Sequence, residues 1–209
     1  MKLFYKPGAC SMATHIILNE LDIPFELEKT DTDAAVTVSG IDFRSISPNG
    51  YVPALQTNDG DIITENPAIL QYLVDGATDS KLAPPNGTLE RTRLHELLNF
   101  LSAELHKAYS PFFSKIELDA SAKEAAQKTL SRRVGAMQDR LADGREFLLG
   151  DTFGVADAYA FVLLSWSPVI GFDLRPWPEV AAYVKRLRRR PAIIRALQAE
   201  GLLDERVAS

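Results

Sequence analysis

The chain changes character at residues 82–87, and few folds are compatible with that change. Before this segment, patterns typical of short strands alternate with patterns typical of helices, whereas only helical patterns follow it. The segment reads Leu82-Ala83-Pro84-Pro85-Asn86-Gly87, and prolines beside a glycine interrupt regular structure. We therefore predict an α+β domain over residues 1–80, a linker over 81–87 and an all-helical domain over 88–209.

The first domain is predicted to have the order β-α-β, then a loop or short helix, then β-β-α. Its strands are expected at residues 2–5, 24–28, 52–56 and from 62 onward. Asn58-Asp59-Gly60-Asp61 is a strong hairpin turn between the last two strands. Its helices are expected at about residues 11–21 and 66–75. Asn66 is suited to the N-cap of the second helix and Pro67 to its first position.

The second domain has helical spacing throughout. Residues 88–112 carry a leucine stripe that repeats about every 3.6 residues. Further helices are expected at residues 121–142, from about 155, from 176–178 and after 190–191. The segment Phe153-Gly154-Val155-Ala156-Asp157 resembles a capping box, in which Asp157 accepts a hydrogen bond from the N-cap backbone. Gly154 at the N-cap position lacks the hydroxyl half of the box.

Composition excludes several classes of protein. The 209 residues are 46% hydrophobic and 24% charged, as in a soluble globular protein with a sizeable core. The net charge of −5 argues against a nucleic-acid or anionic-membrane partner. No apolar run reaches the roughly 20 residues of a membrane span, and we see no signal peptide. One cysteine suggests a reducing compartment, and three histidines without ligand spacing lead us to expect no metal.

Cys10 is the only cysteine, and it falls where the first strand gives way to the first helix. The backbone N–H groups and the dipole at a helix N-terminus favour an anion, so a thiol there ionises more easily. A single thiol cannot close an internal disulfide. Cys10 is therefore a nucleophile, a site for a thiol cofactor or a residue that only caps the helix.

Val52-Pro53 lies where a strand is expected to begin. Because proline cannot donate to a sheet ladder, Pro53 marks an edge, a bulge or a cis bond. A cis bond would turn the N–H and C=O groups of Val52 outward, where an extended peptide could pair with them. The alternative is an ordinary trans proline at the start of a strand.

Glu65-Asn66 precedes the second helix of the first domain. The N–H groups that follow Asn66 could bind a carboxylate, and Glu65 could pair with an ammonium group. The two residues together would suit the head group of an amino acid. The alternative is plain helix capping.

The helix expected at residues 88–112 carries a third candidate group. At 100° per residue, Asn99, Ala103 and His106 project within about 60° of one another, away from the leucine stripe. Polar residues on such a face usually contact only water. His106 is therefore either an ordinary exposed histidine or a functional residue.

These elements together resemble a cytosolic glutathione transferase over essentially the whole chain. The resemblance rests on the element order and on four motifs: Gly8-Ala9-Cys10-Ser11, Val52-Pro53-Ala54-Leu55, Glu65-Asn66-Pro67-Ala68-Ile69 and Phe153-Gly154-Val155-Ala156-Asp157. The opening Met1-Lys2-Leu3-Phe4-Tyr5, together with Cys10, Asn99 and His106, is similar to the bacterial beta class. The family implies a thioredoxin-like N-terminal domain that holds glutathione and an all-helical C-terminal domain.

The resemblance also implies roles for individual residues. A cis bond at Val52-Pro53 would let Val52 pair with the cysteinyl backbone of glutathione, while Glu65 and Asn66 would bind its γ-glutamyl group. Cys10, Ser11 and His106 would surround the glutathione sulfur as catalytic residues. The remaining residues of the glutathione environment would be Asn99, Ala103, Glu104, Leu105 and Lys107. The beta class usually has a glutathione-contacting lysine in the segment that corresponds to Thr32–Ala35. This segment contains no lysine here, which puts that contact in doubt.

Three functions are compatible with this reading. The first is transfer of glutathione to a hydrophobic electrophile held against side chains such as Tyr109, Phe112, Phe113 and Trp166. The alternative is that these aromatic residues belong to the core, and for Trp166 we expect the core. The second is glutathione-dependent thiol–disulfide chemistry through Cys10, which needs only one protein thiol. The third is a non-enzymatic binding or regulatory protein on the same fold. The family implies a cytoplasmic homodimer in detoxification, with glutathione as co-substrate and no metal.

Overall fold

The structure is a computed structural model, and it describes residues 1–77 and 80–203. The chain forms two compact units, one made of Met1–Ser80 with Arg189–Ser209 and the other of Lys81–Arg188. The break at residue 80 coincides with the start of the linker that the prolines indicate. The segment from Arg189 onward groups with the first unit, whereas the sequence led us to place it in the helical domain.

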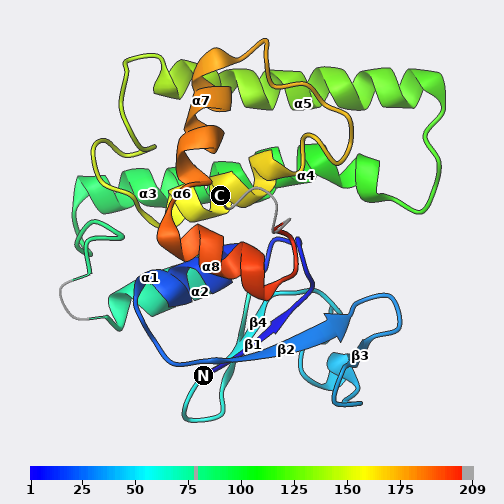
Figure 1. Ribbon diagram of the computed structural model, residues 1–209, viewed down its shortest axis with the longest axis vertical. Helices are drawn as coiled ribbons and strands as arrows, with labels where there is room; N and C mark the ends of the chain where they lie inside the picture. The colour runs from blue at the N-terminus through cyan, green and yellow to red at the C-terminus, as the bar shows by residue number, and fades with distance from the viewer. Residues whose placement is uncertain (78–79, 204–209) are drawn as a thin grey trace. The chain divides into compact units, whose positions relative to one another are not determined.

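The first unit contains a five-stranded sheet of order β3-β2-β1-β4-β5 (Figure 1). Its strands are β1 (Lys2–Tyr5), β2 (Glu26–Asp31), β3 (Val36–Thr37), β4 (Ala54–Gln56) and β5 (Ile62–Thr64). The central strand β1 runs parallel to β2 and antiparallel to β4. Leu3 pairs with Leu27 on one side and Leu55 on the other, and the side chains of Leu3 and Leu55 are fully buried. The sheet is therefore mixed.

Helices α1 (Met12–Glu20), α2 (Asn66–Asp75) and α8 (Pro191–Ala199) gather on one side of this sheet (Figure 1). Helix α1 packs against both α2 and α8. The apolar faces of the three helices supply the core here, and their large fully buried members are Ile16, Ile17, Leu18, Ile69, Leu70 and Ile193. A short 3₁₀ turn, η1 (Phe43–Ser45), follows β3.

The second unit is helical, and its centre is α6 (Val155–Ser165). Every residue of α6 except the last is buried, which explains its nearly continuous apolar sequence. The surrounding elements are α3 (Leu89–Phe100), the π-helical η2 (Leu101–Leu105), α4 (His106–Tyr109), the 3₁₀ η3 (Ser110–Phe113), α5 (Ala120–Leu141) and α7 (Pro178–Leu187). None of the helices in the described part of the chain is both long and apolar enough to cross a membrane.

The start of α6 confirms the predicted role of Asp157. Gly154 N donates to Asp157 Oδ2 at 2.9 Å, while Leu148 N and Tyr183 Oη donate to Asp157 Oδ1 at 2.9 and 2.7 Å. A Cβ atom on Gly154 would lie 2.8 Å from the Leu82 carbonyl oxygen. The close approach of this backbone explains why a glycine, and not a residue with a hydroxyl, stands at the N-cap.

Candidate active site

Cys10 lies just before α1, as predicted, in the loop that follows β1. Its backbone already belongs to the first turn, because Ala13 N donates to Cys10 O at 3.1 Å. The half-buried thiol donates to the carbonyl oxygen of Val52, with Sγ and O 3.2 Å apart. A thiolate in this position would face the negative end of the carbonyl dipole. This geometry therefore suits the protonated thiol and offsets the attraction of the helix N-terminus for an anion.

Ser11 is the N-cap residue of α1, but its hydroxyl does not cap the helix. The side chain is fully buried, and its hydroxyl donates to Lys6 O at 3.4 Å and accepts from Lys6 N at 3.3 Å. The only proton of the hydroxyl is therefore used inside the protein. Ser11 thus helps to close the loop that carries Cys10.

The Val52-Pro53 bond is cis, as the resemblance implied. Pro53 directly precedes β4, and Val52 belongs to a small buried cluster with Phe4, Phe43 and Ala54. The Val52 carbonyl oxygen is the acceptor for the Cys10 thiol. The single thiol and the proline turn therefore lie side by side in the first unit.

Asn66 is not the N-cap of α2, which corrects the interpretation from sequence. The cap is Glu65, and Asn66 is the first helical residue, with its side chain buried. The Asn66 amide donates to Cys10 O at 2.7 Å, and its oxygen accepts from Thr14 Oγ1 at 3.0 Å. The side chain thus ties α2 to the start of α1, a contact between distant segments that capping preferences alone cannot reveal.

Glu65 has a left-handed backbone with φ of 67°, which is rare for a residue other than glycine. Such strained positions persist where the surrounding structure holds them, and they cluster at ligand sites. The carboxylate of Glu65 is exposed at the beginning of α2, where the first N–H groups of the helix also lie. N–H groups that could bind a carboxylate and a carboxylate that could bind an ammonium group therefore lie close together. The amino-acid head-group interpretation requires both.

The segment at Thr32–Ala35 carries no lysine, but a lysine from another loop reaches it. Lys6 Nζ donates to Thr32 Oγ1 at 3.1 Å and lies 4.0 Å from Asp33 Oδ2. Ala35 is buried with φ of 53°. Lys6, from the loop before Cys10, therefore places a cation beside Thr32 and Asp33.

Glu200 supports the loop of Cys10 from the far end of the chain, and the sequence contained no signal for it. Its Oε2 accepts from Gly8 N at 2.9 Å, and its Oε1 lies 2.9 Å from His15 Nδ1. Glu200 and His15 are both buried. Burial and the charge of Glu200 raise the pKa of Tyr5. These contacts give His15 a structural partner beneath α1.

His106 is half-buried against α6 in the second unit. Its Nδ1 lies 2.9 Å from the hydroxyl oxygen of Tyr159. The rings of Tyr159 and Trp166 meet the imidazole edge-on, with centroids 6.1 and 5.1 Å away. Burial, assisted by the neighbouring charge of Lys107, lowers the pKa of His106 from 6.5 to about 4. The imidazole is therefore neutral at physiological pH.

The π-helical turn explains why His106 does not stay on the face predicted for it. Asn99 and Ala103 are exposed, as a regular helix would have them, but five residues from Leu101 to Leu105 adopt i→i+5 bonding. Such a turn adds about one residue and rotates everything after it by roughly 100°. His106 is thereby brought against Tyr159. Single-turn π segments are frequent at functional sites.

The other predicted residues of this helix differ in exposure. Lys107 is exposed, and Glu104 forms an ion pair with Arg133 of α5. Leu105 is fully buried, so its side chain belongs to the core and cannot touch a ligand. Asn99, Ala103, Glu104 and Lys107 present side-chain surface that a ligand could contact.

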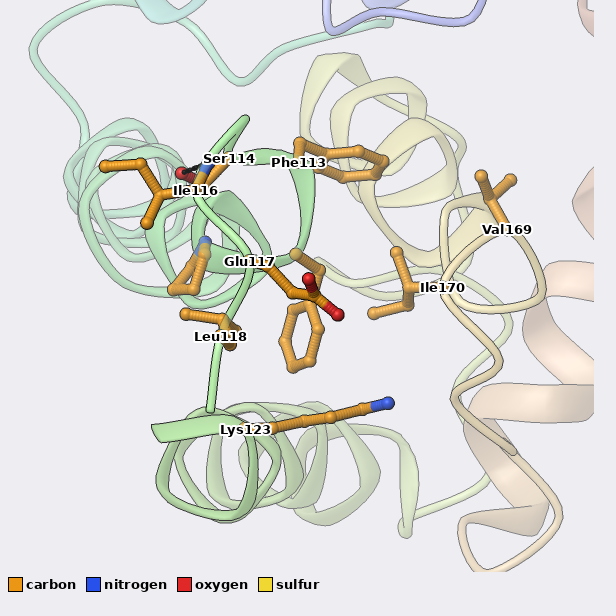
Figure 2. A pocket seen from close by; sticks show the side chains of 10 residues that line it. Phe113, Ser114, Ile116, Glu117, Leu118, Lys123, Val169 and Ile170 are labelled. Carbon is orange, nitrogen blue, oxygen red and sulfur yellow. Dashed lines mark hydrogen bonds between the residues drawn. The ribbon is translucent and has the colours of Figure 1, made fainter. Parts of the chain in front are cut away.

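A cavity of about 370 Å³ opens beside this cluster in the second unit. Figure 2 shows apolar side chains around it, together with Glu117 and Lys123. Its apolar lining comes from Phe112, Phe113, Ile116, Leu118, Val169 and Ile170. Phe113 also meets Trp166 edge-on at 5.3 Å, and Trp166 in turn contacts His106. The indole ring of Trp166 therefore contacts both His106 and Phe113, a residue that lines the cavity.

Two of the four aromatic residues expected to contact an electrophile are core residues. Tyr109 is fully buried, with its hydroxyl oxygen 2.6 Å from Ser167 Oγ. Trp166 is 8% exposed, in agreement with a mainly structural position. Phe112 and Phe113 remain accessible at the cavity.

Comparison with known proteins identifies the family. The glutathione S-transferase N-terminal domain matches residues 8–75, and the C-terminal domain of the same family matches residues 100–191. The chain is 37% identical over 202 residues to glutathione S-transferase GstA of Escherichia coli O157:H7, an alignment that covers 97% of this chain and all of the relative. The chain belongs to the glutathione S-transferase family.

Solved glutathione S-transferases share its whole fold. The bacterial beta-class enzyme of Sphingomonas chungbukensis superposes with a TM-score of 0.92 at 44% identity, and covers 97% of this chain and 100% of its own. A sphingomonad glutathione S-transferase complexed with glutathione gives the same TM-score and coverage at 43% identity. These neighbours confirm the likeness to the beta class and the thioredoxin-like plus helical architecture.

Membership of the glutathione S-transferase family leaves the roles of single residues as proposals. The structure brings Cys10, Val52, Pro53, Glu65 and Asn66 together in the first unit. It places Asn99 and residues 103–107 in the second unit. Tyr159 and Glu200 could not be predicted from sequence patterns, because each contacts a partner far away in the chain. Within the described residues, no group of three or more His, Cys, Asp or Glu side chains could hold a metal ion.

Proposed function

We propose that this chain is a glutathione transferase that joins the thiol of reduced glutathione to hydrophobic electrophiles. The observation that carries the proposal is the meeting of three motifs from distant parts of the sequence. Cys10 Sγ lies 3.2 Å from Val52 O, and Cys10 O accepts from the Asn66 amide at 2.7 Å. A thiol, a proline turn and a helix start therefore form one site. Full-length relatives named as transferases favour catalysis over a purely binding role.

Glutathione would bind to this site through its peptide backbone and its head group. Val52 would pair with the cysteinyl residue as a short added strand. The exposed carboxylate of Glu65 would attract the ammonium of the γ-glutamyl group, and the first N–H groups of α2 would bind its carboxylate. Asn66 would contribute through its backbone, because its amide group already holds α1 and α2 together. Asn99, Ala103, Glu104 and Lys107 would complete the environment of glutathione.

Conjugation requires that glutathione lose its thiol proton to water and that its sulfur attack an electrophilic carbon, from which the leaving group departs with the bonding electrons. The protein accelerates this step by stabilising the thiolate. A neutral His106 can donate one hydrogen bond to the sulfur, and the N–H groups at the start of α1 favour the negative charge. Ser11 serves as a positioning residue for the loop, since its hydroxyl is bonded to Lys6.

The electrophile would occupy the cavity beside Phe112 and Phe113. Its volume of about 370 Å³ suits a small organic molecule, and its lining combines apolar side chains with the polar Ser114, Glu117 and Lys123. The scattered origin of the lining residues explains why no sequence motif announces the second substrate. The family supports the further proposal of a cytoplasmic homodimer in detoxification that needs no metal.

A second activity, thiol–disulfide exchange, is supported by the half-buried thiol of Cys10 at the edge expected to hold glutathione. The thiolate of Cys10 would attack a disulfide that contains glutathione and release the other thiol. A second glutathione thiolate would then attack the mixed disulfide, regenerate Cys10 and leave as oxidised glutathione. The disulfide substrate is reduced in this cycle, and glutathione is oxidised to its disulfide.

The proposed transferase activity is tested by calorimetric titration with glutathione and by turnover of an aryl halide electrophile. We expect saturable binding, an ultraviolet thiolate band from the bound ligand, and release of halide in proportion to conjugate. Glu65→Gln should weaken glutathione binding, whereas the exposed Glu146→Gln should leave it unchanged. Binding without a thiolate band and without turnover of any electrophile would favour the non-enzymatic alternative.

A further inference from the structure

Tyr159 and His106 are in direct contact within the second unit. Tyr159 lies in the middle of α6, and only 2% of its surface is exposed. Its hydroxyl oxygen is 2.9 Å from His106 Nδ1, a good hydrogen-bond distance. The two residues are 53 positions apart and belong to different helices. Burial of a hydroxyl is costly unless it forms a hydrogen bond, and the His106 imidazole is a partner for the Tyr159 hydroxyl here.

The ring of His106 is fixed in orientation by its neighbours. Tyr159 meets it at an interplanar angle of 88° and Trp166 at 61°, so that two aromatic edges hold the imidazole plane. Neither ring contact determines which nitrogen carries the proton. A neutral imidazole has one N–H donor and one bare nitrogen, and the hydrogen bond at one nitrogen selects the tautomer.

The chemistry of the pair favours one direction for this hydrogen bond. A phenol O–H is a more acidic donor than the N–H of a neutral imidazole, and a bare imidazole nitrogen is a stronger base than a phenol oxygen. The bond therefore runs from Tyr159 Oη–H to a bare Nδ1. The remaining proton of the ring must then reside on Nε2. A histidine in this form presents a permanent N–H donor and has no lone pair to offer from Nε2.

We propose that Tyr159 is a positioning residue that donates its hydroxyl proton to Nδ1 of His106 and holds the imidazole as the Nε2–H tautomer. The inference rests on the proposed function for its consequence in catalysis. In that function, His106 stabilises the glutathione thiolate as a hydrogen-bond donor and does not remove the thiol proton as a base. The depressed pKa of His106 keeps the imidazole neutral and agrees with this assignment.

Nuclear magnetic resonance tests the tautomer without reference to activity. The chain has three histidines, so that long-range proton–nitrogen correlation on protein with ¹⁵N-labelled histidine can be assigned with a His106→Gln variant. In the unmodified chain we expect a protonated Nε2 and a bare Nδ1 for His106. A protonated Nδ1 would overturn the proposal. This measurement needs neither glutathione nor turnover, so it can fail or succeed independently of the transferase assignment.

Tyr159→Phe removes the hydroxyl and keeps the ring. We expect the His106 nitrogen shifts to move toward a mixture of tautomers. We expect kcat to fall roughly 10-fold, as for the loss of one hydrogen bond, with little change in KM for glutathione. Unchanged nitrogen shifts would also overturn the proposal. If the shifts move but kcat does not, Tyr159 sets the tautomer and the donor role of His106 in the proposed function is wrong.

Tyr109→Phe is the matched control for this substitution. Tyr109 is likewise buried, and its ring contacts the same Trp166 edge-on at 5.7 Å. Its hydroxyl bonds to Ser167 and not to His106. We expect the His106 nitrogen shifts to stay unchanged in this variant. Equal changes in both variants would mean that packing of the cluster, and not the Tyr159 hydroxyl, sets the tautomer, which would overturn the proposal.

Discussion

Gly8 N donates to Glu200 Oε2 at 2.9 Å, so that the loop before Cys10 is held by a residue 192 positions later. The second carboxylate oxygen lies 2.9 Å from His15 Nδ1 beneath the same loop. Because Gly8 has φ of +73°, its backbone turns in a way that favours glycine, and the N–H group it exposes needs an acceptor. Glu200 provides that acceptor in a buried setting.

Glu200→Ala should therefore destabilise the first unit. The substitution leaves Gly8 N–H and the His15 ring without their buried acceptor, which we expect to lower the free energy of unfolding by about 1–3 kcal/mol. Chemical denaturation followed by circular dichroism measures the loss. Glu200→Gln keeps an acceptor of the same shape and should cost less. Equal stability of all three proteins would contradict the structural role of this carboxylate.

Cys10→Ala should separate the two activities. Reduction of a glutathione mixed disulfide needs the protein sulfur as nucleophile, so that this activity should be abolished. Conjugation uses the sulfur of glutathione and does not need the protein sulfur as nucleophile, so that its rate should change by less than about 10-fold on loss of the hydrogen bond to Val52. Cys10→Ser, which retains a donor for Val52, is the matched control. Parallel loss of both activities would sink the division of roles.

Asn66→Ala should loosen the start of α1. The amide bridges Cys10 O and the buried Thr14 hydroxyl, so its removal takes one of the hydrogen bonds of Cys10 O and the acceptor of Thr14 Oγ1. We expect a loss of about 1–3 kcal/mol in unfolding free energy, together with weaker binding of glutathione. Thr14→Val removes only one of the two bonds and should cost less. A double-mutant cycle that finds the two substitutions additive would argue against direct coupling.

The low pKa of His106 predicts a pH dependence of stability. With a pKa of about 4 in the folded protein against 6.5 in the unfolded chain, His106 binds its proton more readily when unfolded. Between those two values the unfolded state holds more protons, so that stability rises with pH and is lost on acidification. His106→Gln should therefore lose less stability than the unmodified chain from pH 6.5 to 4. Identical slopes in denaturation series at several pH values would rule out the shifted pKa.

Gly154→Ser should be harmful although serine is a better N-cap residue. The added Cβ would lie 2.8 Å from the Leu82 carbonyl oxygen, and we expect the required shift to cost about 1–3 kcal/mol. Gly135→Ala in α5 is the contrasting control, because its Cβ meets nothing closer than Trp177 Nε1 at 3.7 Å. That change should stabilise the helix by about 0.5–1 kcal/mol. Thermal unfolding distinguishes the two signs.

The order of the elements could be predicted because strands and helices are encoded locally. The predicted strand at residues 2–5 and the turn before β5 depend on neighbours in the sequence, as does the capping role of Asp157. The same holds for the linker. Local patterns were also enough to single out Cys10 and Val52-Pro53 as unusual, although their meaning came from the likeness to a family.

The features that sequence reasoning missed depend on contacts between distant segments. Asn66 is the first helical residue and not the cap of α2, and its side chain forms hydrogen bonds with Cys10 O and Thr14 Oγ1. His106 moved off its predicted face because a π turn changed the helical register, which a constant 100° per residue cannot anticipate. Glu200 and Tyr159 have no local pattern at all. Their roles exist only once the chain has folded.

The position of α8 has a consequence for the order in which the protein can form during synthesis. Helix α8 packs on α1, and Glu200 directly follows α8. The ribosome therefore releases about 110 residues of the helical unit before the segment that completes the first unit emerges, at roughly 5–20 residues per second. During those seconds the loop of Cys10 lacks its final support. The nascent chain is thus expected to complete the surroundings of Cys10 last, although this cysteine is among the first residues made.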